Sequence, residues 1–145
     1  MTYTFASSEY MQEVQRRTNT DARYLELSKG ESLSYTMVIE PEPPKGVTER
    51  RVVGYRTVDG PITEVWEGER PTNMVISAPY GIWVSILLGK VSVTRAFLTR
   101  KLRLKGNLAT ILKMSKSTDR WLEILHTIPT QFLGMYEKDS IQGVG

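Results

Sequence analysis

The stretch Gly89–Met114, GKVSVTRAFLTRKLRLKGNLATILKM, decides the fold, because helix and strand patterns follow one another within it. Apolar side chains at helical spacing occupy residues 93–97. In residues 101–105 two leucines alternate with three basic residues, as in a strand with one buried and one wet face. Gly106 supplies a permissive turn, and Asn107 is a good N-cap for a following helix. The stretch therefore predicts a helix, a strand and a second helix around a common interior.

The remainder of the chain predicts four more strands and several helices. Strand-like runs occupy residues 34–40, 51–58, 62–67 and 74–77, and they are separated by Gly- and Pro-rich turns. Short strands joined in this way favour an antiparallel meander. Helical patterns begin near residues 8, 21, 79 and 117. The predicted fold class is α+β, with a five-stranded, mainly antiparallel sheet covered by helices.

Length and composition limit the class of protein. A chain of 145 residues suits one domain, and we expect that domain to span residues 1–138, with a flexible C-terminal tail at 139–145. No apolar run approaches the ~20 residues of a membrane span, and the start does not resemble a signal peptide. The absence of cysteine excludes disulfides and thiolate metal sites. A cytoplasmic location is the simplest expectation.

Charge is distributed unevenly along the chain. The net charge of +3 combines −3 in residues 1–89 with +6 in residues 90–145. The candidate docking face consists of Arg95, Arg100, Lys101, Arg103 and Lys105. Such a face suits transient contact with an anionic membrane or an anionic headgroup. A solvated outer face that protects an exposed strand from aggregation explains the same residues, and both interpretations remain open.

Catalytic patterns are missing from the sequence. The only histidine, His126, lies beside the apolar side of the last predicted helix. No metalloprotease, serine hydrolase or phosphate-cradling motif is present. The carboxylates near Glu64 are not spaced to converge on a metal. We therefore expect no enzyme, no catalytic residues, no metal and no cofactor.

Several motifs resemble the signature of the sterol carrier protein family of lipid-binding domains. The residues that carry the resemblance are Gly89-Lys90, Ala96-Phe97, Lys101–Asn107 and Leu112-Lys113, with Val75–Tyr80 and Trp83 upstream and a fainter match at Ser8-Glu9 and Asn19–Asp21. The chain departs from the family pattern at Arg100, where glycine is usual, and at Val93, where proline is frequent. Arginine is strained if position 100 needs a left-handed backbone.

The resemblance implies an apolar tunnel between the sheet and the helices. Apolar residues are concentrated after residue 80, and by periodicity alone they fit a closed core as well as a tunnel wall. The candidate lining residues are Trp83, Ile86, Leu87, Phe97, Leu108, Ile111, Leu112, Trp121, Ile124 and Leu125. By resemblance, the ligand is a long-chain lipid or acyl molecule such as a fatty acid, a fatty acyl thioester or a sterol-like lipid. Such pockets are mostly apolar with few polar anchors.

An alternative function uses the same fold as an accessory or dimerisation module. In this hypothesis Met135 and Tyr136 are exposed on a C-terminal extension and dock a biosynthetic enzyme or a second copy, so that a homodimer is one outcome. Nucleic acid is not an expected partner, because the basic residues lack interleaved aromatic side chains for base stacking.

Overall fold

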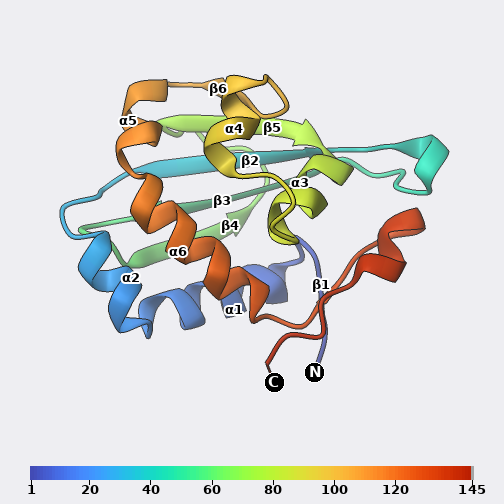
Figure 1. Ribbon diagram of the computed structural model, residues 1–145, viewed down its shortest axis with the longest axis horizontal. Coiled ribbons are helices and arrows are strands. Elements are labelled where there is room, and N and C mark those ends of the chain that lie inside the picture. Colours follow the sequence, from blue (N-terminus) through green and yellow to red (C-terminus); the bar gives the residue numbers. More distant parts are fainter. Residues whose placement is uncertain (145) are drawn as a thin grey trace.

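The computed structural model describes residues 1–144 as a curved β-sheet with the helices on one side of it (Figure 1). The main sheet contains β2 (Ser34–Glu40), β3 (Arg51–Thr57), β4 (Ile62–Glu67), β5 (Met74–Pro79) and β6 (Arg103–Lys105). The helices are α1 (Ser8–Asn19), α2 (Ala22–Leu27), α3 (Tyr80–Leu87), α4 (Val93–Leu98), α5 (Leu108–Lys113) and α6 (Ser115–His126). Two short strands, β1 (Tyr3–Thr4) and β7 (Thr130–Gln131), pair in parallel, and 3₁₀ turns form at η1 (Pro43–Lys45) and η2 (Gly134–Asp139).

The strand order of the main sheet is β4-β3-β2-β5-β6. The α+β class is confirmed, and three of the four pairings are antiparallel. The predicted meander is wrong at one point, because β5 lies beside β2 and runs parallel to it. After β4 the chain crosses back, and the Asn73 side chain accepts hydrogen bonds from the Ser34 backbone N and Oγ at 2.9 and 3.0 Å. These contacts fix the start of β5 against the start of β2.

The two faces of the sheet differ in what covers them. On the inner face, Tyr35, Met37 and Ile39 of β2 share rows with the β5 residues at positions 74, 76 and 78. On the outer face no helix covers the strands among residues 1–144. There the Trp66 ring lies over Gly54, with the Arg70 guanidinium 4.6 Å from the ring centre. The main hydrophobic core therefore lies between the inner face and the helices.

The stretch 89–114 folds largely as its residues predict. Ser92 caps α4, and the Asn107 side chain caps α5 by accepting from the Thr110 backbone N at 3.1 Å. The strand is shorter than predicted, because it begins at Arg103. Arg100 has φ +60°, the left-handed conformation that follows a helix end, and the backbone N of Lys101 closes that turn on the Ala96 carbonyl. The strained backbone expected at position 100 is therefore present.

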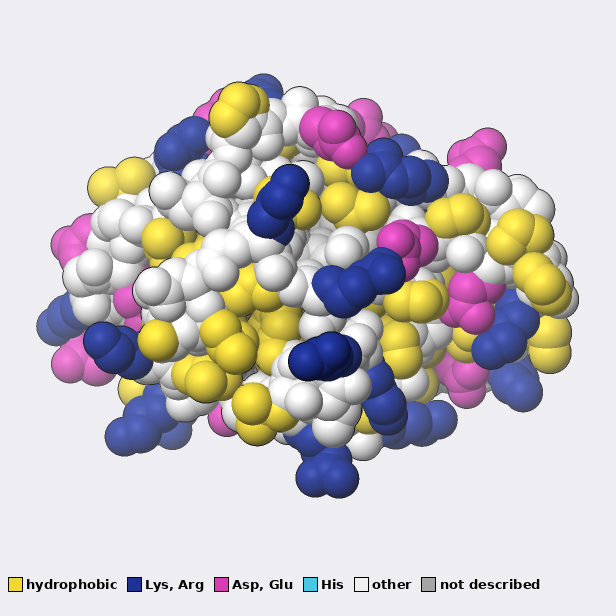
Figure 2. Space-filling model, turned by 90° about the horizontal axis from the view of Figure 1, so that it is seen from above, with side chains coloured by type: hydrophobic (Ala, Val, Ile, Leu, Met, Phe, Trp, Pro, Cys, Tyr) yellow, Lys and Arg dark blue, Asp and Glu magenta, His cyan; other side chains and the backbone are white. Residues whose placement is uncertain are grey.

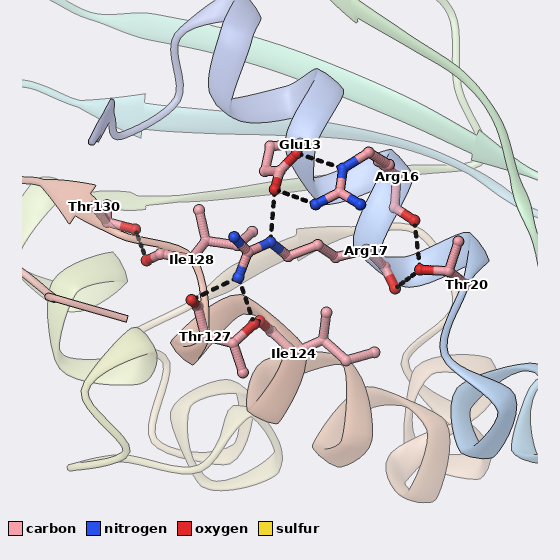
Figure 3. A network of polar contacts seen from close by, with 8 residues as sticks. All are labelled: Glu13, Arg16, Arg17, Thr20, Ile124, Thr127, Ile128 and Thr130. Carbon is pink, nitrogen blue, oxygen red and sulfur yellow. Dashed lines mark hydrogen bonds and ion pairs between the residues drawn. The ribbon is translucent and has the colours of Figure 1, made fainter. Parts of the chain in front are cut away.

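Helix α1 is fixed to the end of α6 by a buried charge network (Figure 3). The Glu13 carboxylate accepts from Nε and Nη2 of Arg16 at 2.8 and 2.7 Å and from Nε of Arg17 at 2.6 Å. Arg17 also donates to the carbonyl oxygen of Thr127 at 2.7 Å, beyond the last turn of α6. Hydrogen bonds from the two arginines lower the pKa of Glu13 from its usual 4.5 to about 2. The charge of this nearly buried carboxylate is thus satisfied within the fold.

The C-terminal residues pack against the body of the protein. Ile141 is buried and forms a bridge with Thr130, and the Val144 backbone N donates to the Thr127 carbonyl. The part of the predicted tail (139–145) up to Ile141 is therefore packed against the rest of the protein. Gly145 lies outside the described residues. No helix within residues 1–144 is long and apolar enough to cross a membrane.

Candidate functional site

An apolar cavity of about 100 Å³ lies between the inner face of the sheet and the helices. A water molecule needs about 10–15 Å³ of such space, so the cavity exceeds a simple packing defect. Its walls are formed by Phe5, Ala6, Tyr10, Met11, Val14, Tyr35, Met37, Ile39, Val53, Tyr55, Ile76, Trp83, Ile86, Leu87, Val93, Phe97, Leu102, Ile111, Thr118, Trp121, Leu122 and Leu125. Apolar cavities of this kind hold apolar ligands and remain dry when empty.

Seven of the ten predicted lining residues meet at this cavity. They are Trp83, Ile86, Leu87, Phe97, Ile111, Trp121 and Leu125. The other three lie elsewhere: Leu108 is 36% exposed at the start of α5, Leu112 is half-buried, and Ile124 is buried outside this wall. Helix α5 is only one and a half turns long, so it directs few side chains inward. Whether any of these residues binds a ligand stays a prediction.

Sequence reasoning missed the wall formed by the N-terminal segment and the sheet. Tyr10, Met11 and Val14 recur at helical spacing, but we expected α1 only to cover the sheet. The alternating residues Tyr35, Met37 and Ile39 line the opposite side. Both patterns were visible, but neither shows that a cavity, rather than a filled core, separates the two elements.

The cavity lining contains no charged side chain among residues 1–144. Its polar groups are the Thr118 hydroxyl, the phenols of Tyr10, Tyr35 and Tyr55, and the indole N–H groups of Trp83 and Trp121, which donate to the Ala78 carbonyl and the Thr18 hydroxyl. The Tyr10 hydroxyl is buried without a hydrogen-bond partner, and burial raises the pKa of that phenol. Burial likewise raises the pKa of Tyr55 well above the usual value. The phenols therefore remain neutral, and the cavity gives no compensation for a buried ionic group.

A wall of three aromatic rings separates this cavity from a smaller one. Tyr35 and Tyr55 stack with ring centres 4.5 Å apart, and Trp121 lies against Tyr55 at 5.2 Å. The Trp121 indole N donates to the buried hydroxyl of Thr18 at 3.0 Å, which holds the ring in place. The three rings line both cavities, and the smaller one measures about 30 Å³. The two spaces are therefore neighbours across a single layer of side chains.

The five residues of the predicted docking face are all exposed. Figure 2 views the molecule from the side that carries α4, α5 and β6, where Lys and Arg side chains surround an apolar area. Leu98 lies on α4 and is 64% exposed. One member of the face is partly neutralised, because Arg103 forms an ion pair with Glu40 of β2. The sequence did not indicate this partner, because Glu40 and Arg103 are 63 positions apart in the sequence.

His126 is exposed at the end of α6. Within residues 1–144, no three His, Asp or Glu side chains lie close enough to hold a metal ion. The apolar cavity between the sheet and the helices is the candidate site.

Comparison with known proteins agrees with the fold. The sequence profile of the SCP-2 sterol transfer family matches residues 52–119, from the start of β3 into α6. No curated protein sequence matches the chain. The profile match confirms the resemblance that the sequence motifs predict.

Solved structures of sterol carrier proteins share the fold at low sequence identity. A crystal structure of sterol carrier protein 2 has a TM-score of 0.77 at 19% identity, over 86% of this chain and 98% of that chain. A Thermus thermophilus protein described as possibly a sterol carrier protein gives 0.74 at 19% identity, over 86% and 90%. A palmitated sterol carrier protein 2-like protein from Aedes aegypti gives 0.50 at 11% identity, over 82% and 93%.

Proposed function

We propose that this protein is a non-enzymatic carrier that binds a long-chain lipid or acyl ligand and transfers it between surfaces. The apolar cavity between sheet and helices carries this proposal, because its lining is almost free of polar groups. The match to the SCP-2 sterol transfer family profile and the palmitate of the Aedes aegypti protein support the same class of ligand. Burial of an alkyl chain contributes about 0.8 kcal/mol per methylene, so affinity needs little polar recognition. A cytoplasmic site of action stays a prediction.

The cavity must widen to accept such a ligand. An engineered cavity of about 150 Å³ holds one benzene molecule, whereas this one has about 100 Å³. The half-exposed lining residues Trp83, Val93 and Leu122 lie on α3, α4 and α6, and we place the entrance between them. Helix α4 has only six residues and is the segment best able to move aside. Ligand should therefore slow amide hydrogen exchange in α4 more than in α1.

Tryptophan fluorescence offers a test with an internal control. Trp83 and Trp121 line the cavity, whereas Trp66 lies on the outer face of the sheet. Delipidated variants that retain one tryptophan each would be titrated with a brominated fatty acid, which quenches only on contact. We expect saturable quenching of Trp83 and Trp121 and no quenching of Trp66. Equal quenching of all three, or no saturation, would contradict binding in the cavity.

The basic face supports a proposal for how the carrier meets a donor membrane. Each cation near an anionic surface contributes about 1 kcal/mol, within a Debye length of about 8 Å. The exposed Leu98 side chain adds an apolar contact on α4, next to the proposed entrance. The triple variant K101Q/R103Q/K105Q should slow ligand exchange with anionic vesicles at low salt and leave exchange with neutral vesicles unchanged. If rates stay equal at low and high salt, the face is only solvated.

In the scaffold alternative, only one of the two proposed docking residues is exposed. Tyr136 is half-buried, against the prediction, because its hydroxyl donates to Glu42 at 3.0 Å and its ring packs against Tyr80. Met135 remains 60% exposed. Sedimentation of the delipidated protein separates the two functions. A stable complex with an enzyme or a second copy, without extractable lipid, would favour the scaffold.

A further inference from the structure

The smaller cavity is lined by polar groups that include, among residues 1–144, one carboxylate. It lies beyond the ring wall of Tyr35, Tyr55 and Trp121, and its 30 Å³ would hold about two water molecules. Glu31 and Ser117 line it from the segment before β2 and from the first turn of α6. A polar compartment therefore adjoins the apolar cavity at the α2 side of the molecule.

Glu31 is held in place but keeps free acceptor positions. The Ser117 hydroxyl, which is itself buried, lies 2.8 and 3.0 Å from the two carboxylate oxygens. The Glu31 backbone N donates to the Ser28 carbonyl, and its carbonyl accepts from the Gly60 backbone N. A carboxylate offers about four acceptor positions, so one hydroxyl leaves most of them open. Burial raises the pKa of Glu31, which reflects the low polarity around it.

Neither cavity is lined by a cation among residues 1–144. No Lys, Arg or His belongs to the lining of the apolar cavity or of the smaller one, and Glu31 is the only acidic residue in either. A fatty carboxylate placed here would be buried without a counter-charge and would face a second carboxylate, which is unfavourable. A neutral hydroxyl would instead donate to Glu31 in a charge-assisted hydrogen bond, one of the stronger kinds.

We propose that Glu31 and Ser117 bind the hydroxyl end of a neutral long-chain ligand whose alkyl part fills the apolar cavity. This rests on the proposed carrier function and adds a selectivity to it: a fatty alcohol or another hydroxylated neutral lipid binds better than the fatty acid of equal length. The rings of Tyr35, Tyr55 and Trp121 line both compartments, and they must move apart for the chain to reach from one to the other. An acid binds only with its carboxylate outside, towards the basic face.

Displacement of a fluorescent apolar probe from delipidated protein tests this selectivity at neutral pH. The competitors are dodecan-1-ol, dodecanoate and methyl dodecanoate, which have the same chain but differ in charge and in hydrogen-bond donation. We expect the alcohol to bind about tenfold more tightly than the ester, because only the alcohol donates to the carboxylate. Dodecanoate should bind more weakly than the alcohol.

The Glu31→Gln variant should reduce the preference for the alcohol and strengthen binding of dodecanoate several-fold. Glu137→Gln, which changes an exposed carboxylate on η2, serves as the charge-matched control and should leave all three affinities unchanged. A general loss of packing would lower the three affinities together. If the three competitors bind equally, or E31Q leaves the ratios of their affinities unchanged, the inference is overturned while the carrier function stands. If none displaces the probe, the carrier function itself fails.

Discussion

The two walls of the cavity are built in different ways. Helix α1 has 12 residues and is fixed by polar side chains to two other parts of the fold: Arg17 reaches Thr127, and Asn19 pairs with Ile62. The opposite wall, from α4 through α5, consists of two six-residue helices and a three-residue strand. Among described residues, its side chains form one ion pair with another element, Arg103–Glu40. We call the α1 side of the cavity the fixed wall and the side from α4 through α5 the yielding wall. We expect the ligand to enter through the yielding wall.

The fixed wall should lose most when its buried charge network is broken. Glu13→Gln removes the charge that both arginines share, and Arg17 is then left with only 15% of its side chain exposed and no anion. We expect unfolding free energy to fall by about 2–3 kcal/mol in urea denaturation. Arg16→Gln is the matched control, because Arg16 is 63% exposed and its loss should cost less than about 1 kcal/mol. Equal losses would show that burial does not determine the effect.

The same network makes stability depend on acid. The pKa of Glu13 is about 2 in the folded protein and near 4.5 when unfolded, so its ionised form favours folding. This contribution is fully present above pH 4.5 and is lost as the pH falls towards 2. Stability curves of the native protein and of E13Q should therefore converge over that range. A constant difference between the curves would contradict the assignment.

A smaller effect is expected from Asn19, which joins α1 to the edge of the sheet. Its side chain donates to the Ile62 carbonyl and accepts from the Ile62 backbone N, each at 2.8 Å, as a neighbouring strand would. Asn19→Ala should cost about 1–2 kcal/mol of global stability. Asn107→Ala removes a cap in the yielding wall and should mainly speed amide exchange in α5. If N107A lowers the global stability more than N19A does, the assignment of the fixed and the yielding wall is reversed.

Local features of the fold were predictable, and long-range pairings were not. The cap at Asn107 depends on a few neighbouring residues and follows from the sequence, whereas the left-handed turn at Arg100 was only a condition that the family pattern raised. The parallel pairing of β2 with β5 depends on a return crossing that turn residues do not encode. The contact between Glu31 and Ser117 spans 86 residues, so no spacing rule indicates it. For the same reason the sequence suggested lining residues on the helices but not the size of the space they enclose.

The smallest predicted effect concerns the turn at Arg100, which lies in the yielding wall. Arg100 adopts φ +60°, which costs a side chain with a Cβ atom but not glycine. Arg100→Gly relieves this strain but adds freedom to the unfolded chain, and at a helix end of this type the relief should exceed the added freedom by about 0.5–1 kcal/mol. Arg100→Ala is the matched control, because it removes the same charge and keeps the strain. Denaturant unfolding should rank the glycine variant above both the alanine variant and the native protein. If the glycine and alanine variants are equally stable, the turn contributes no strain. The mobility proposed for α4 then rests only on the few side-chain contacts that fix this helix to the fold.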